Sequence, residues 1–182
     1  MDGCTMGTDS YLASTLVGKL LRKIVKEKSY KELYQLESFT DLDDYLQSIL
    51  KDLFAALNVV KNQLALEKNE LLTTLLLLLV DKQQNTGIVL VIGDGLVCIN
   101  GEVTEFDQDN KPDYLGFHLQ EEVESWYANQ QQKIVVNNIS DISIATDGIS
   151  MFTAVKKAAT PDSINPVDFL LSDKQEQIMR IC

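Results

Sequence analysis

Apolar side chains recur at helical spacing in the first third of the chain. In residues 9–27 they repeat every four positions, which places them on one face of a predicted helix that Thr8 or Asp9 caps. This face consists of Leu12, Leu16, Leu20 and Ile24. The same spacing over residues 41–64 predicts a second amphipathic helix, for which Thr40 is the expected N-cap.

The pattern changes to strands after residue 69. Residues 71–80 form one apolar stretch apart from Thr73 and Thr74, and after a polar turn further apolar strands continue as far as Phe106. Asn100-Gly101 is typical of a two-residue hairpin turn. We therefore expect an antiparallel meander over residues 71–106. Strands that are apolar on both faces also predict two stacked sheets, or a sheet covered by helices.

Two further short strands are predicted at 134–136 and 142–145, with residues 137–140 as the turn between them. The segment that contains Trp126 has no clear period, so we expect it to be irregular.

A helical pattern returns near the end of the chain. Residues 149–158 are predicted to be helical, and Asn165 is expected to cap a last helix with Pro166 at its first position. The order of helices, antiparallel strands and helices predicts an α+β fold, an antiparallel β-sandwich flanked by helices. We expect residues 1–182 to form a single domain of this kind.

Charge and cysteine content narrow the set of partners. The chain has 27 acidic and 16 basic residues, and a net charge of -11 makes nucleic acid and membrane surfaces unfavourable partners.

The cysteines, Cys4, Cys98 and Cys182, are far apart and form no CxxC pair, which argues against structural zinc and a disulfide framework. With no signal peptide pattern and no apolar run of membrane-spanning length, we expect a cytoplasmic protein.

Carboxylates follow predicted strands at two places in this acidic chain. Asp147-Gly148 ends the strand 142–145, and Asp94-Gly95 interrupts the apolar strands of the expected meander. A strand fixes the direction of such a carboxylate, and a glycine tolerates a sharp turn after it, which suits a metal ligand. A structural bulge is the favoured interpretation of Asp94-Gly95, and a third pair, Asp2-Gly3, is by itself better explained as a terminus without a role.

The order of these motifs resembles that of the metal-dependent type 2C serine/threonine protein phosphatases. Asp2-Gly3 and the helix that follows it resemble the family's early Asp-Gly turn, and Gly93-Asp94 resembles its Gly-Asp step between core strands. Residues 109–112, Asp-Asn-Lys-Pro, are similar to its Asp-His-Lys-Pro loop, with Asn110 in place of histidine. Ala145-Thr-Asp-Gly148 resembles its Ser-Asp-Gly motif.

This resemblance implies a function and a set of ligands. It implies hydrolysis of phosphoserine and phosphothreonine in proteins by a water that two Mg²⁺ or Mn²⁺ ions activate. Asp2, Gly3 and Asp147 are the implied metal ligands, and Asp94 and Gly148 are implied to support them. A phosphorylated protein is then the substrate, and no cysteine or serine nucleophile is needed. His118, the single histidine, is expected to be a surface or packing residue.

The chain also departs from the family pattern. The family has an acidic residue and a phosphate-binding arginine before the first Asp-Gly, and a late strand with an Asp-Asn pair, none of which this sequence contains. We therefore expect a domain that is incomplete at both ends and weak or inactive as a phosphatase. A non-catalytic phosphatase-like binding module is the alternative. Open sheet edges would in either case favour association between copies of the chain.

Overall fold

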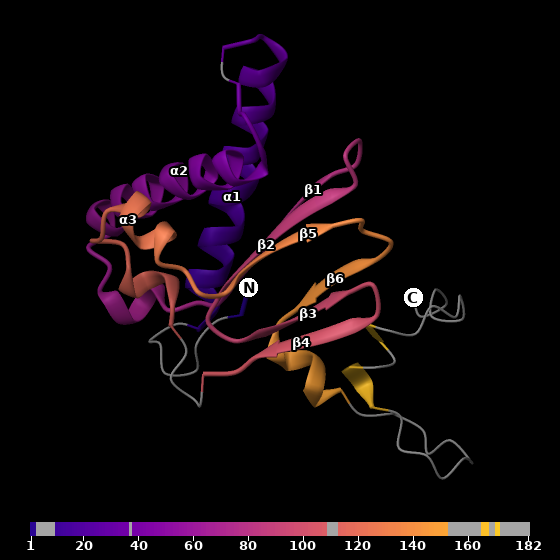
Figure 1. Ribbon diagram of the computed structural model, residues 1–182. Helices are drawn as coiled ribbons and strands as arrows, with labels where there is room; N and C mark the ends of the chain where they lie inside the picture. The colour runs from indigo at the N-terminus through magenta and orange to yellow at the C-terminus, as the bar shows by residue number, and fades with distance from the viewer. Residues whose placement is uncertain (3–9, 37, 109–112, 153–164, 168–169, 172–182) are drawn as a thin grey trace, which may run out of the picture.

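The computed structural model describes residues 1–2, 10–36, 38–108, 113–152, 165–167 and 170–171 (Figure 1). These residues form α-helices, 3-10 turns (η) and two antiparallel sheets. The helical elements are α1 (Ser10–Leu33), α2 (Leu42–Gln63), η1 (Lys68–Leu71), η2 (Leu115–Phe117), α3 (Val123–Ala128) and η3 (Asp147–Met151). The strands are β1 (Leu75–Asp81), β2 (Thr86–Ile92), β3 (Gly95–Ile99), β4 (Glu102–Phe106), β5 (Lys133–Asn137) and β6 (Ile142–Ala145).

The two long helices follow the predicted amphipathic segments. Helix α1 extends to Leu33, six residues beyond the predicted end. Helix α2 begins one residue after the predicted start, and its N-cap is Asp41 rather than Thr40. The Asp41 carboxylate accepts a hydrogen bond from the Asp44 N–H at 2.9 Å, and the Asp44 carboxylate accepts one from the Thr40 N–H. Asp41 is the better cap because its carboxylate also carries the negative charge that a helix N-terminus favours. The expected caps of α1, Thr8 and Asp9, lie outside the described residues.

The strands form two separate sheets, so the expected single meander is wrong. The first sheet has the order β1-β2-β5 and the second has the order β4-β3-β6, and all four pairings are antiparallel. The chain leaves the first sheet between β2 and β3, where Gly93 has a φ of 85°. The predicted turn at 137–140 is also a crossing between sheets, because β5 pairs with β2 and β6 pairs with β3. The Asn100-Gly101 hairpin is confirmed, with positive φ at both residues.

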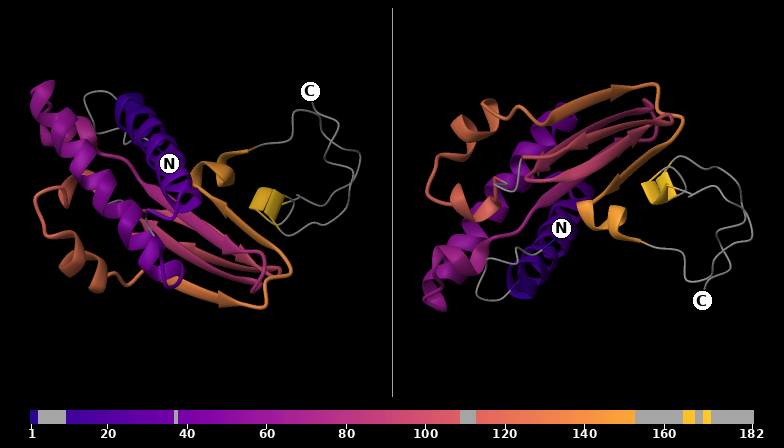
Figure 2. Two further views of the ribbon diagram at one scale, coloured as in Figure 1. Left: turned by 90° about the horizontal axis from the view of Figure 1, so that it is seen from above. Right: turned by 90° about the horizontal axis from the view of Figure 1, so that it is seen from below.

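Alternate side chains of β1 and β2 enter two different cores. Leu75, Ile88 and Leu90 belong to a large core shared with α1, α2 and α3. Leu76, Val89 and other residues on the opposite faces of the same strands pack against the second sheet. The molecule therefore has a helical layer over one sheet and a second sheet beneath it (Figures 1 and 2). This confirms the predicted α+β sandwich and explains why the strands of the first sheet are apolar at successive positions.

The remaining predictions for the second half of the chain are in part wrong and in part fall outside the described residues. Trp126 lies in the short helix α3 rather than in an irregular segment. Residues 147–151 form a 3-10 turn, and the rest of the predicted helix at 149–158 lies outside the described residues. The Asn165 side chain accepts a hydrogen bond from the Val167 N–H at 3.0 Å, as expected of a cap, whereas most of the last predicted helix is not described. None of the described helices has the length and apolar composition that a membrane crossing needs.

A polar contact joins α2, α3 and β5 at the edge of the large core. The Asp43 carboxylate accepts hydrogen bonds from the Tyr127 hydroxyl at 2.7 Å and from the Lys133 ammonium at 3.1 Å. Partial burial by itself raises the pKa of Asp43, but the hydrogen bonds from Tyr127, Lys133 and Gln47 outweigh burial and lower the pKa below its ordinary value of 3.8. The Tyr127 side chain is almost fully buried, so its hydroxyl has a fixed partner.

We expect Tyr127→Phe to lower the free energy of unfolding at neutral pH by about 1 kcal/mol, because the variant loses a hydrogen bond to a charged but partly exposed acceptor. The stabilisation that Asp43 provides is present above its unfolded pKa and disappears as the pH falls through its lower folded pKa. The difference in free energy of unfolding between Tyr127→Phe and the parent protein should therefore shrink below about pH 4. Urea unfolding at several pH values measures this, with the exposed Tyr30→Phe as the matched control. A difference that stays constant down to pH 2 would contradict the contribution of Asp43.

Candidate metal-binding edge

Three aspartates adjoin strand ends at one end of the second sheet. In β3 and β6, Leu96 pairs with Ala145, so the same register two residues further places Asp94 opposite Asp147. In β3 and β4, Gly95 pairs with Phe106, which places Asp94 opposite Asp107. We call Asp94, Asp107 and Asp147 the acidic edge. Asp94 is its central member and is partly buried, whereas the outer two are exposed.

The charges of the acidic edge affect one another. The pKa of Asp94 is raised, first by burial and then by the negative charges of Asp107 and Asp147. The Gln108 N–H donates a hydrogen bond to the Asp94 carboxylate at 3.0 Å and opposes this shift. Asp94 is therefore held in place by the backbone while it lies in the field of two like charges, an arrangement that a bound cation would stabilise.

Asp2 is fixed at the neighbouring end of the first sheet through its main chain. Its carbonyl oxygen accepts hydrogen bonds from the Thr74 N–H at 3.0 Å and from the Thr73 hydroxyl at 2.8 Å. Its N–H donates to the Thr74 hydroxyl at 3.1 Å. A Cβ placed on Gly93 would lie 2.8 Å from the Thr74 Cγ2, so Thr74 also packs directly against the residue that precedes Asp94. Thr74 thus connects Asp2 to the acidic edge.

The structure brings together only part of the predicted site. Asp94 and Asp147 lie at the same sheet end and affect each other through their charges. The Asp2 main chain is linked to this end through Thr74, but no contact among the described residues joins the Asp2 carboxylate to Asp147. Gly3 lies outside the described residues. Gly148 has no positive φ, and a Cβ there would meet only the Thr146 hydroxyl at 3.8 Å. The turn after Asp147 therefore does not require glycine, contrary to the expectation from the sequence.

Two residues of this region were not predicted from the sequence. Asp107 belongs to none of the motifs in the sequence, although it follows a strand just as Asp147 does. Thr74 also belongs to none of these motifs, and its contact with Asp2 spans 72 positions in the sequence. His118 was expected to be a surface or packing residue. It packs against Trp126 with ring centroids 5.4 Å apart, and its two ring nitrogens contact the carboxylates of Asp113 and Glu121.

The donor chemistry of this edge fits a hard divalent cation. Carboxylate and carbonyl oxygens are the ligands that Mg²⁺ and Mn²⁺ prefer, and the edge contains no thiolate or imidazole that would favour zinc. Within the described ranges, no group of three His, Cys, Asp or Glu side chains is close enough to hold one ion. These residues thus have the right chemistry, but they do not by themselves form a complete metal centre.

The sequence model of protein phosphatase 2C matches residues 1–180. The chain belongs to the protein phosphatase 2C family. No curated protein and no solved structure gives a match. The two antiparallel sheets and their helical cover are consistent with a phosphatase 2C domain, and the motifs that carried the resemblance lie in the matched range. Of these motifs, residues 109–112 lie outside the described part of the chain.

Proposed function

We propose that this chain hydrolyses phosphoserine and phosphothreonine in proteins with Mg²⁺ or Mn²⁺ bound near the acidic edge. The observation that carries the proposal is the register of β3 with β6, which places two aspartates at one sheet end in a chain of the phosphatase 2C family. An acidic edge without cations would repel a phosphate group, so binding of a phosphorylated substrate here depends on metal ions.

Two of the proposed ligands, Asp147 and Asp2, have a structural support among the described residues. We propose Asp147 and Asp2, with the carbonyl of Gly3, as metal ligands, and Asp94 and Gly148 as supporting residues. Strand β6 fixes the backbone that leads into Asp147, and Thr74 fixes the Asp2 main chain. When bound, such ions supply positive charge for the phosphate and lower the pKa of a water molecule that attacks it.

The proposal predicts that phosphatase activity depends on a divalent metal. The departures from the family pattern predict a weak or inactive chain, but the family match over residues 1–180 favours one that is active. We therefore expect the chain to release phosphate from a phosphothreonine peptide in the presence of Mn²⁺. We expect excess EDTA to abolish this release, because only the metal offsets the charge of the acidic edge. Phosphate release and Mn²⁺ calorimetry on the same preparation measure the two effects. Hydrolysis that continues in EDTA would contradict the proposal.

A non-catalytic phosphatase-like binding module is the second candidate. The observation that favours it is the lack of a three-residue metal-binding group among the described residues. Calorimetry separates the two candidates, because a binding module of this kind would show no heat of Mn²⁺ binding at millimolar concentrations, whereas the enzyme would.

A further inference from the structure

Helix α1 carries a row of basic side chains on the side that faces away from the core. Residues 10–26 contain four of the 16 basic residues of the chain and none of its 27 acidic residues. The four are Lys19, Arg22, Lys23 and Lys26, and all of them are exposed. Their spacing of three and four positions places them together, opposite the side of α1 that enters the large core. We call these four residues the basic row.

Most positive charges of the basic row are unpaired. Lys23 has an exposed ion pair with Glu27 at 3.7 Å, whereas the other three have no carboxylate within ion-pair distance among the described residues. Arg22 and Lys26 are four positions apart, and like charges at this spacing destabilise a helix. The helix dipole favours cations in the last turn of α1, but the basic row lies before that turn. In the free chain, neither the core nor the dipole thus offsets the repulsion within the row.

Two large side chains continue the same side of α1 beyond the basic row. Tyr30 and Leu33 follow Lys26 at helical spacing and are 54% and 73% exposed. The last turns of α1 extend past the rest of the helical layer (Figure 1). The outward side of α1 therefore has unpaired cations along its middle and exposed apolar surface at its end.

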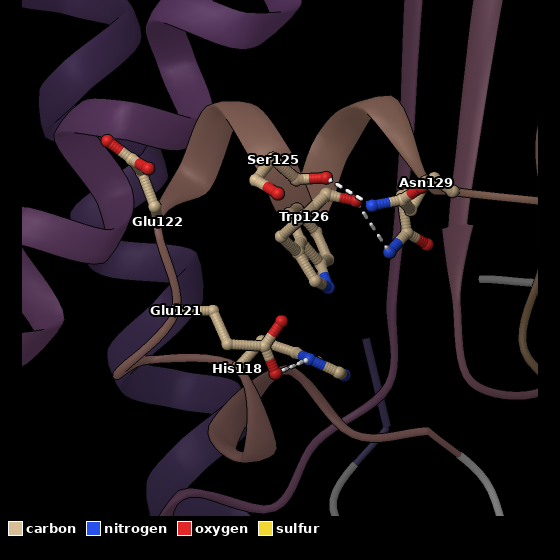
Figure 3. Close-up of a pocket in the computed structure, with 7 residues that line it drawn as sticks. His118, Glu121, Glu122, Ser125, Trp126 and Asn129 are labelled. Atoms are coloured by element: carbon tan, nitrogen blue, oxygen red, sulfur yellow. Dashed lines mark hydrogen bonds and ion pairs between the residues drawn. The ribbon is translucent and has the colours of Figure 1, made fainter.

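The cavity beside α3 has the opposite charge. It has a volume of about 470 Å³, and its wall includes Glu121 and Glu122 (Figure 3). The Trp126 indole N–H has no acceptor among the described residues, and the ring packs against His118 with centroids 5.4 Å apart. Carboxylates in the wall repel an anion. An acidic ligand is therefore expected at α1 and not in this cavity.

We propose that the outward side of α1 binds an acidic helical segment of a partner protein. Carboxylates of the segment pair with the basic row and remove the repulsion between its members, while apolar side chains of the segment cover Tyr30 and Leu33. Side chains on one side of a helix recur about every 5.4 Å, against about 6.7 Å along a strand, so a second helix keeps its carboxylates aligned with the row. This inference goes beyond the proposed function, because it involves neither phosphate nor metal.

A protein segment fits this surface better than another polyanion does. A nucleic acid or a membrane is much wider than one helix and would bring its negative charge close to the rest of the chain, whose net charge is -11. A single helix contacts the basic row alone, and it also supplies the apolar side chains that Tyr30 and Leu33 lack in the free chain.

Calorimetry with a designed peptide tests the proposal. The peptide has 15 residues, with leucine at positions 1 and 4, glutamate at positions 8, 11, 12 and 15, and alanine elsewhere. In an antiparallel helix these positions mirror the spacing of the basic row, Tyr30 and Leu33, and the reversed sequence covers the parallel direction. We expect saturable binding of one of the two peptides to the 182-residue chain. The version with glutamine in place of glutamate should bind at least about tenfold more weakly.

Arg22→Gln/Lys26→Gln separates the basic row from general charge. This double variant should bind the acidic peptide at least about tenfold more weakly, because two exposed ion pairs are lost. It should also raise the melting temperature of the free chain by about 1–3 °C, because repulsion within α1 is reduced. Lys51→Gln/Lys82→Gln is the matched control, because it removes two exposed lysines outside α1. This control should leave peptide binding unchanged.

Several outcomes would overturn the proposal. One is that neither peptide binds up to about 1 mM. Another is that Arg22→Gln/Lys26→Gln lowers the melting temperature, since the basic row would then have a structural role. Equally tight binding of a single-stranded DNA 15-mer or of phosphatidylserine vesicles would assign the row to another polyanion. A dimer in light scattering that the same double variant converts to a monomer would make a second copy of the chain the occupant.

Discussion

Asp147→Asn is expected to reduce Mn²⁺-dependent phosphate release by at least about 100-fold. Loss of an outer residue that supports a metal ligand lowers affinity or activity by about 10–100-fold, and loss of a ligand itself should exceed this range. Asparagine keeps the size of the side chain and one oxygen, but it removes the negative charge that a hard cation prefers. Asp147 is exposed at the end of β6, so the substitution should leave the free energy of unfolding almost unchanged.

Asp141→Asn is the matched control for this experiment, because Asp141 lies at the opposite end of β6. Its main chain pairs with Asn100, and its carboxylate is remote from the acidic edge by the length of the strand. Steady-state hydrolysis of a phosphothreonine peptide and Mn²⁺ calorimetry should show a loss for Asp147→Asn and none for Asp141→Asn. Equal activity of both variants would remove Asp147 from the proposed set of ligands.

The layered fold was predictable from the sequence because of its most apolar strands. A strand that is apolar at successive positions, such as β1, has to be covered on both faces, and the structure provides helices on one face and a sheet on the other. The crossing at Gly93 was not predictable. A hairpin and a crossing between sheets both look like a short turn between apolar strands, and the strand that completes the first sheet, β5, lies far along the chain.

The site was predictable to the extent that its residues lie at strand ends. Asp94 and Asp147 are predictable from the sequence because each is adjacent to a strand pattern. Asp107 has the same signal, directly after β4, but the polar residues that follow it are equally typical of an ordinary loop. The unpaired indole of Trp126 has no signal in one sequence, because it depends on which side chains pack around the ring in the folded chain.

Gly93→Ala is expected to lower the free energy of unfolding by about 3 kcal/mol. Gly93 has a φ of 85°, a conformation that costs a residue with a Cβ about 1–2 kcal/mol. The new Cβ would also lie 2.8 Å from the Thr74 Cγ2, and overpacking of this kind costs about 1–3 kcal/mol. Urea unfolding followed by the fluorescence of the single tryptophan measures the change. Gly101→Ala is the matched control, because Gly101 has a φ of 92° with nothing within 4 Å of a new Cβ, so only the first cost applies.

The two costs at Gly93 are separable with a second substitution. Thr74→Ser removes the methyl group that the new Cβ would meet, but it keeps the hydroxyl that accepts the hydrogen bond from the Asp2 N–H. We expect the double variant Gly93→Ala/Thr74→Ser to recover most of the overpacking cost and to resemble Gly101→Ala in stability. No recovery in the double variant would show that Thr74 and Gly93 are not in close contact.

The same contact predicts an effect on metal binding, since Thr74 connects Asp2 to the residue before Asp94. Gly93→Ala alone should weaken Mn²⁺ binding at temperatures where the chain remains folded, and the double variant should restore it.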